Sequence, residues 1–295
     1  MKRSKSDRLF DGCVYILLGT ALILVSYPLI YIVSASFSDS LAVISGRMVL
    51  WPVGFNLEGY KAVFREASVM TGYLNSLVYT VLGTLLNIVM TILAAYPLSR
   101  PDLYGKRPLT MLFLFVMLFN AGMIPNYMLV RDLGLMNTRM AMIFPTALSI
   151  YNMIIAKSFF QNTIPIDLLE AAKLDGCSDF RFVTSIVLPL SSSIVAVLAI
   201  FYGIAHWNAY FPALLYLNDR SMYPLQLVLR DILLQNQMSP EMLASINPED
   251  AAARESLSEL LKYSLIVVAS APMMIIYPFV QKYFVKGVMI GALKG

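Results

Sequence analysis

Six apolar stretches, separated by shorter polar segments, dominate the pattern of the chain. They cover approximately residues 14–35, 73–97, 108–130, 140–160, 184–210 and 263–283. A helix of about 20 apolar residues crosses the hydrocarbon core of a bilayer. The period-two alternation of a membrane β-strand is absent from these stretches. The pattern therefore predicts an all-α membrane protein with six transmembrane helices.

The composition is typical of a multi-pass membrane protein. Of the 295 residues, 58% are hydrophobic and 14% are charged, and the mean hydropathy is +0.69. Soluble domains carry roughly 25% charged residues. The net charge of +4 is better explained by membrane topology than by nucleic-acid binding. Cys13 and Cys177 are both expected at the inner face, so neither a disulfide nor a metal site is predicted.

The basic residues predict that both termini are cytoplasmic. With the N-terminus inside, thirteen of the 22 Lys and Arg residues fall in inner segments, as the positive-inside rule requires. The first apolar run is longer than the roughly 7–15 residues of a signal-peptide core, so we interpret it as an uncleaved span. A leader cleaved at Val33-Ser34-Ala35 is the alternative.

The spans lack the chemistry of a self-powered transporter or an enzyme. Their cores hold no Asp, Glu, Lys or Arg, which ion-coupled carriers use to carry the coupling charge. Phosphate-binding loops, GxSxG elbows and metalloprotease motifs are missing from the sequence. The one histidine of the chain, His206, lies within the fifth stretch and is either an interfacial anchor beside Trp207 or a contact in the pore. If the protein pumps a solute, the energy must therefore enter from another subunit.

A short helix is predicted in the polar segment between the fourth and fifth apolar stretches. Asp167 and Glu170 are placed to form a capping box, and Gly176 is placed to end the helix in a left-handed turn. Ser178 or Asp179 then caps the next helix, which Pro189 bends where it enters the fifth span. A helix of about eight residues is marginal in water, so it should dock on a partner or lie on the membrane surface.

The same segment resembles the EAA loop of ABC importer permeases, whose general form is EAAxxDG followed by LP. The residues that match are Glu170, Ala171, Ala172, Asp175, Gly176, Leu188 and Pro189. Val183 departs from the aromatic residue common in the family, and Ser193 from a second proline. Neither departure falls in the helix itself.

Other segments are similar to carbohydrate-uptake permeases of the maltose type. They are GFNLEGYKAVF before the second span, Asn75-Ser76, HWNAYFPALLYL at 206–217 and the tail QKYFVKGVMIGALKG. Among these permeases, the lipoprotein-linked complex-oligosaccharide permeases of Gram-positive bacteria look most similar. The resemblance implies a type I ABC importer transmembrane domain. It divides the chain into an N-terminal span and outer loop (1–72), a core (73–285) with a coupling helix at about 168–175, and a cytoplasmic tail (286–295).

The resemblance implies the partners and the source of energy. A second, different permease subunit completes the pore, two ATPase subunits bind ATP and Mg²⁺, and an extracellular solute-binding protein or lipoprotein delivers the sugar. This chain itself would be no enzyme and would bind no cofactor. The seven residues that match the motif would contact the ATPase, and so would Lys286, Gly287, Lys294 and Gly295 of the tail. A purely electrostatic membrane anchor is the alternative for the tail.

Several polar and aromatic side chains are candidates for the substrate path. They are Asn75, Asn120, Tyr151, Asn152, Trp207, Asn208 and Tyr210. Helix packing or an interfacial aromatic belt is the alternative for each of them. A permease for peptides or amino acids, and a self-contained channel or carrier, remain the alternatives for the protein as a whole.

Overall fold

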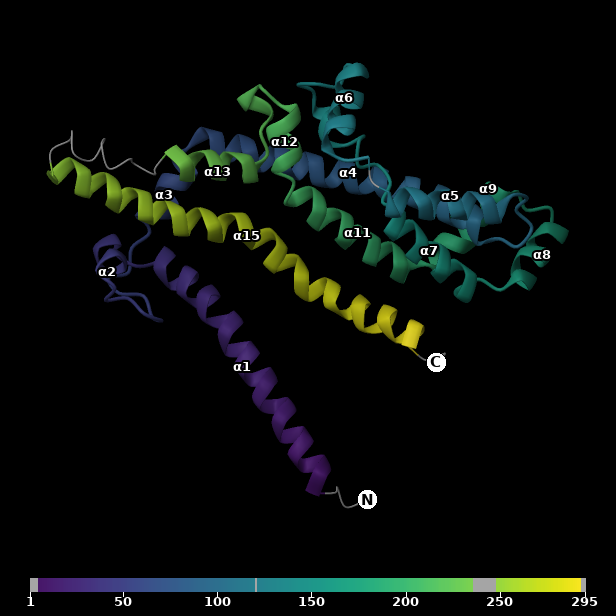
Figure 1. Cartoon of the computed structure of the whole chain (residues 1–295), viewed down its shortest axis with the longest axis horizontal. Coiled ribbons are helices and arrows are strands. Elements are labelled where there is room, and N and C mark those ends of the chain that lie inside the picture. The colour runs from purple at the N-terminus through teal and green to yellow at the C-terminus, as the bar shows by residue number, and fades with distance from the viewer. Residues whose placement is uncertain (1–4, 120, 236–247, 293–295) are drawn as a thin grey trace. The chain divides into compact units, whose positions relative to one another are not determined.

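The computed structural model describes residues 5–119, 121–235 and 248–292, and every regular element in these ranges is a helix. The helices up to the middle of the chain are α1 (Lys5–Ser36), α2 (Ser40–Ile44), α3 (Glu58–Arg65), α4 (Ala67–Ser99), α5 (Lys106–Leu118), α6 (Met123–Asp132), the 3-10 helix η1 (Arg139–Met142) and α7 (Ile150–Thr163). The remaining ones are α8 (Ile166–Leu174), α9 (Asp179–Phe182), the π-helix η2 (Val183–Val187), α10 (Leu188–Leu190), α11 (Ser192–Trp207), α12 (Phe211–Tyr216), the 3-10 helix η3 (Arg220–Met222), α13 (Leu225–Gln235) and α15 (Pro248–Ala292) (Figure 1).

Three of these helices are long and apolar enough to cross a membrane. The candidate spans are Leu9–Ser36 in α1, Ala67–Ser99 in α4 and Ser258–Pro278 in α15. Two further pairs pass the same test together but are bent, α5 with α6 by 111° and α9–α10 with α11 by 83°. The described residues thus hold three to five candidate spans, and the six expected from the sequence are not all accounted for.

The apolar stretch at 140–160 differs most from its expected form. It consists of η1, an irregular segment and α7, which has only 14 residues where about 20 are needed to cross a bilayer. The third expected span is also interrupted, because Gly122 at the start of α6 has a φ of +88°, which lies outside helical geometry.

The chain divides into two compact units. The first holds Met1–Val69 and Leu229–Pro272, and the second holds Met70–Val228 and Met273–Gly295. These units do not coincide with the segments 1–72, 73–285 and 286–295 that the family resemblance implies, and that division stays a prediction.

In the first unit, the turn after α1 packs on the span of α15. Ala35, Val43 and Met48 are buried together, with Tyr31 and Tyr263 against them. Gly59 of α3 lies so close to α15 that an added Cβ would stand 2.8 Å from the carbonyl oxygen of Leu260. Only glycine permits this approach.

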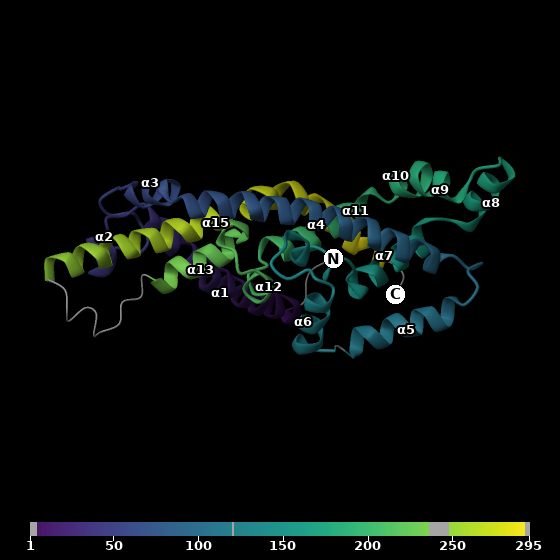
Figure 2. The same ribbon diagram turned by 90° about the horizontal axis from the view of Figure 1, so that it is seen from above.

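In the second unit, α4 and α11 lie side by side (Figures 1 and 2). The Thr91 and Tyr202 hydroxyls are hydrogen-bonded at 2.7 Å, and His206 Nε2 lies 2.7 Å from Asn87 Oδ1. The Asn87 amide nitrogen donates to the carbonyl oxygen of Thr146, so its oxygen is free to accept from His206. Buried polar groups paired in this way fix the register of two helices.

Candidate functional site

Helix α8 contains the sequence motif and ends as predicted, but it begins differently. Gly176 has a φ of +71°, and its N–H donates to Lys173 O at 3.0 Å, while the Cys177 N–H donates to Ala172 O at 2.9 Å. This pair of hydrogen bonds is the Schellman motif. The predicted capping box is wrong, because Pro165 occupies the N-cap and Asp167 lies in the first turn. There, the carboxylate still complements the helix dipole.

One face of α8 is buried within the chain and the other is open. Leu169 and Ala172 are buried in an apolar core that also holds Phe160 and Phe182. Five of the motif residues are divided between the two faces: Ala172 points inward, while Glu170, Ala171, Asp175 and Gly176 are exposed. The helix is thus seated on its own chain through one face, while the residues of its other face remain exposed.

Two large apolar side chains in and after α8 are almost fully exposed. Leu174, at the end of α8, is 90% exposed, and Phe180, in α9, is 79% exposed. Isolated exposed leucines are ordinary, but a leucine and a phenylalanine at this level of exposure on either side of a rigid turn are typical of a docking surface.

The chain leaves α8 through a rigid but sharply bent connection. Ser178 caps α9 by accepting from the Arg181 N–H at 3.3 Å, as the sequence predicts. The π-helix η2 follows, and the Leu188 N–H donates to Val183 O just before Pro189. Because proline has no N–H and its ring displaces the preceding turn, the wider π geometry is a natural accommodation. The bend itself follows at Ser191, between α10 and α11.

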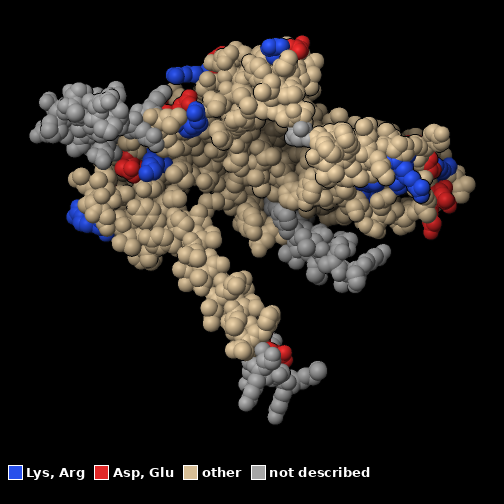
Figure 3. Space-filling model, in the orientation of Figure 1, with Lys and Arg blue, Asp and Glu red and all other residues tan. Residues whose placement is uncertain are grey.

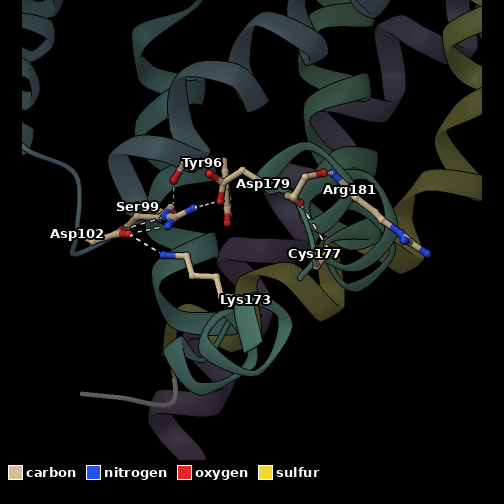
Figure 4. Close-up of polar contacts among 9 residues, drawn as sticks. Tyr96, Ser99, Asp102, Lys173, Cys177, Asp179 and Arg181 are labelled. Carbon is tan, nitrogen blue, oxygen red and sulfur yellow. Dashed lines mark hydrogen bonds and ion pairs between the residues drawn. The ribbon is translucent and has the colours of Figure 1, made fainter. Parts of the chain in front are cut away.

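A cluster of charged residues ties α8 and α9 to the end of α4. Arg100 donates through Nε and a terminal nitrogen to the two carboxylate oxygens of Asp102, at 2.9 and 2.6 Å, and through its other terminal nitrogen to Asp179 at 2.7 Å. Lys173 Nζ, from α8, lies 3.3 Å from the same Asp102 (Figure 4). Figure 3 shows basic and acidic side chains gathered where α8 and α9 lie.

The electrostatics of this cluster follow from its geometry. The hydrogen bonds from Arg100 hold the pKa of Asp102 well below its usual range, because they favour the charged form of the carboxyl. The pKa of Arg100 is raised for the same reason. Its side chain is only 14% exposed, so it depends on these carboxylates for its polar contacts.

Sequence reasoning missed the cluster. On the sequence alone, Arg100 and Lys173 are only topology signals, and Asp102 has no assigned role. The available signal was Arg-Pro-Asp directly after a span, since an arginine and an aspartate two residues apart on a turn are close enough to pair.

Asn75 and its neighbours in α4 hold the segment before α13. The Asn75 amide donates to Ser221 O at 2.8 Å and Tyr223 O at 3.1 Å, and the Tyr79 hydroxyl donates to Met222 O at 2.8 Å. The Asn75 side chain therefore positions the backbone of residues 221–223. This contact fits the alternative in which Asn75 serves packing and not the substrate path.

The other substrate-path candidates differ in burial. Asn152 and Trp207 are buried, with Trp207 edge-on to Tyr73 at 5.5 Å. Tyr151 and Tyr210 are exposed, and Asn208 is exposed and donates back to Ile204 O within its own helix. Asn120 lies outside the described residues. The described candidates thus differ in burial and lie on or beside three helices, α4, α7 and α11.

His206 is buried rather than interfacial. It is 6% exposed, and its ring lies against Gly83 of α4. Of the two alternatives for His206, an anchor exposed at the surface does not fit this burial, because the side chain turns into the α4–α11 contact.

A largely apolar cavity of about 630 Å³ lies beside this contact. It is lined in part by Thr80 and Thr84 of α4, Gly203 of α11 and Tyr277 of α15. The Thr80 and Thr84 hydroxyls are buried and have no hydrogen-bond partner among the described residues. These hydroxyls are further candidates for the substrate path.

The tail residues are only partly described. Lys286 and Gly287 fall within α15, while Lys294 and Gly295 lie outside the described residues. Within the described part of the chain, no three His, Cys, Asp or Glu side chains come together as metal ligands.

Comparison with known proteins gives matches over almost the whole chain. Residues 1–290 match the family described as "Binding-protein-dependent transport system inner membrane component". The polygalacturonan/rhamnogalacturonan transport system permease protein YtcP of Bacillus subtilis is 42% identical, over 98% of this chain and 99% of that protein. Protein LplC of the same organism is 37% identical, over 100% of this chain and 98% of that protein.

A solved structure has the same fold. It is the crystal structure of a bacterial ABC transporter involved in the import of the acidic polysaccharide alginate. One of its chains superposes with a TM-score of 0.86 at 32% identity, covering 96% of this chain and 99% of that one.

Proposed function

The chain belongs to the family of binding-protein-dependent transport system inner membrane components, and from that premise we propose that it forms half of the translocation pore of an ATP-driven oligosaccharide importer. It is a permease subunit of the ABC importer class and a protein of the cell membrane. The observation that carries the proposed mechanism is α8. This helix is stopped by a Schellman turn, seated on its own core through Leu169 and Ala172, and open on the face of Glu170 and Ala171.

The finer points of topology and assembly are part of the proposal. Six spans with both termini in the cytoplasm place α8 on the side where ATP is available. A second, different permease completes the pore, and two ATPase subunits seat α8 in a cleft. An extracellular binding protein, here a lipoprotein, delivers the substrate. ATP and Mg²⁺ bind to the ATPase, and this chain binds no cofactor and catalyses no reaction.

The proposed substrate is an oligosaccharide with acidic sugar units. The name of one relative refers to polygalacturonan and rhamnogalacturonan, and the matching structure is that of a transporter involved in the import of the acidic polysaccharide alginate. Stimulation of ATPase activity in the reconstituted complex, measured with acidic oligosaccharides, neutral oligosaccharides, peptides and amino acids, tests this. If only peptides or amino acids stimulate the ATPase activity, the proposed oligosaccharide substrate is wrong.

Uptake by variants of α8 tests the coupling mechanism. Gly176→Pro forbids the φ of +71° and Glu170→Lys reverses an exposed charge, so both are expected to abolish uptake while membrane insertion stays intact. Glu66→Lys changes another exposed glutamate and should transport normally. Normal uptake in both α8 variants, or transport by the purified chain without an ATPase, contradicts the proposal.

A further inference from the structure

The loop between α2 and α3 exposes an unusual number of large apolar side chains. Residues 47–55, named here the Trp51 loop, include Trp51 at 82% exposure and Phe55 at 72%. Val49, Leu50 and Val53 are exposed as well. Exposed apolar groups gathered on one loop mark an interaction site, and neither the coupling helix nor the substrate path makes use of this loop.

The Trp51 loop is held in place by hydrogen bonds to the end of α1. Ser34 Oγ donates to Leu50 O at 2.5 Å, and the Val53 N–H donates to Ser38 Oγ at 3.1 Å. The Asp39 N–H donates to Val53 O at 2.9 Å. The backbone on both sides of Trp51 is therefore fixed to the chain that leaves α1.

Burial of the neighbouring methionine points the other side chains outward. Met48 is 2% exposed and packs with Ala35 and Val43. With Met48 inside and the backbone fixed at Leu50 and Val53, Trp51 remains on the outside. Its exposure is a property of the fold and not of a loose segment.

The same hydrogen bonds place the loop at the depth where α1 leaves the membrane. The candidate span Leu9–Ser36 has 28 residues, or roughly 42 Å of helix, against about 30 Å for the hydrocarbon core. Ser34 lies in the last turn of that span, at headgroup level, and its hydrogen bond to Leu50 holds Trp51 at the same level.

The chemistry of the loop matches that level of a bilayer. Tryptophan is enriched at the membrane–water interface, where its ring is apolar and its N–H is polar. Arg47, at the start of the loop, is exposed and suits anionic phosphate groups. In α1, Leu29, Ile30 and Val33 are exposed, so the span has apolar surface directly before the residues to which the loop is bonded.

We propose that the Trp51 loop is a membrane-interface anchor, with Trp51 inserted among lipid headgroups beside the end of α1. The anchor fixes the depth of α1 and of the turn that follows it. A protein surface, on the second permease or the binding protein, is the competing occupant, and the experiment below separates the two.

Tryptophan fluorescence gives a direct test, because the chain has two tryptophans and Trp207 is only 3% exposed. The full chain is reconstituted in bilayers whose lipids carry bromine close to the headgroup, both alone and in the complete transporter. The wild type and Trp51→Phe are compared, so that the difference between them reports Trp51. We expect strong quenching of the wild type and loss of most of that quenching in Trp51→Phe. Trp207→Phe is the matched control, which should keep the quenching.

Two results would overturn the anchor. Equal quenching of the wild type and Trp51→Phe by brominated lipid would show that Trp51 does not contact lipid. A Trp51 signal that is open to a water-soluble quencher in bilayers, and protected only when the second permease or the binding protein is added, would assign the loop to a protein partner. The phenylalanine variant preserves an apolar ring, and its melting temperature in detergent is measured to show that it folds.

Discussion

Arg100 and Asp102 form a bidentate ion pair directly beyond the end of α4, with nitrogen–oxygen distances of 2.9 and 2.6 Å. A third hydrogen bond, from Arg100 to Asp179, extends the pair to α9. Because Lys173 of α8 also reaches Asp102, one carboxylate joins the end of α4 to the helix that contains the sequence motif.

Asp102→Asn is expected to loosen α8 from α4. The carboxylate is 46% exposed, so we expect a loss of only about 1 kcal/mol in the free energy of unfolding. The larger effect should be on coupling, seen as less uptake per ATP hydrolysed in the reconstituted transporter. Asp132→Asn is the control, because its partner Arg131 is a neighbour in sequence and both are exposed. Equal coupling in the two variants would contradict a positioning role.

The same carboxylate should make stability depend on acid. The folded-state pKa of Asp102 is lowered, so its contribution is fully present above the unfolded pKa of about 3.9 and is lost as pH falls through the folded value. Melting temperatures of the wild type in detergent should therefore fall from about pH 4 downwards. The melting temperature of Asp102→Asn should fall less steeply over that range. If the two melting curves against pH are parallel, other groups dominate the acid dependence.

Gly176 and Gly134 separate a folding effect from a coupling effect. Both have positive φ, +71° and +68°, and an added Cβ would meet no atom within 4 Å at either. Alanine should therefore cost about 1 kcal/mol of folding free energy at each position, through backbone strain alone. Only Gly176→Ala changes the end of α8, so it alone should lower uptake. Similar uptake in the two variants would show that the geometry of this turn is unimportant.

Gly83 and Gly203 form a second matched pair, in the contact between α4 and α11. An added Cβ at Gly83 would overlap the His206 ring, whereas at Gly203 the nearest atom is 3.8 Å away. Gly83→Ala should displace His206 from Asn87 and destabilise the protein by about 1–3 kcal/mol. Gly203→Ala should melt at the wild-type temperature or slightly above it. Thermal melting in detergent measures the stability of both variants. A wild-type melting temperature for Gly83→Ala would show that His206 can move aside at no cost.

Short sequence signals predicted the end of α8 and the start of α9, because both depend on residues close together in the chain. Gly176 ends α8 because only glycine adopts a positive φ without strain, and Ser178 caps α9 because its hydroxyl reaches an N–H three residues ahead. Asp167 is not the cap of α8 because Pro165 is already suited to the turn before a helix, which moves the first helical residue to Ile166. A shift of two residues at a helix end is beyond what propensity resolves.

The features that were missed depend on tertiary contacts. Hydropathy averaged over 140–160 did not reveal that the segment before α7 is irregular, because apolar residues serve equally well in a buried turn. Arg100 and Asp179 are 79 residues apart in the chain, and His206 and Asn87 are 119 apart. Such pairs form only once α4 lies beside α9 and α11, so a single sequence gives little sign of them.

The contacts along α4 have a mechanical consequence. They begin at Tyr73, which meets Trp207, continue through Asn87 and Thr91, and end at Arg100, which meets Asp179. From Tyr73 to Arg100 is roughly 40 Å of helix. Because they are joined at both ends and in the middle, α4 and the α9–α11 segment should move as one rigid body. A tilt of about 10° at one end would shift the other end by ~7 Å over this length. A small tilt at the Arg100 end of α4, next to α8, is therefore converted into a displacement of several ångströms at the Tyr73 end.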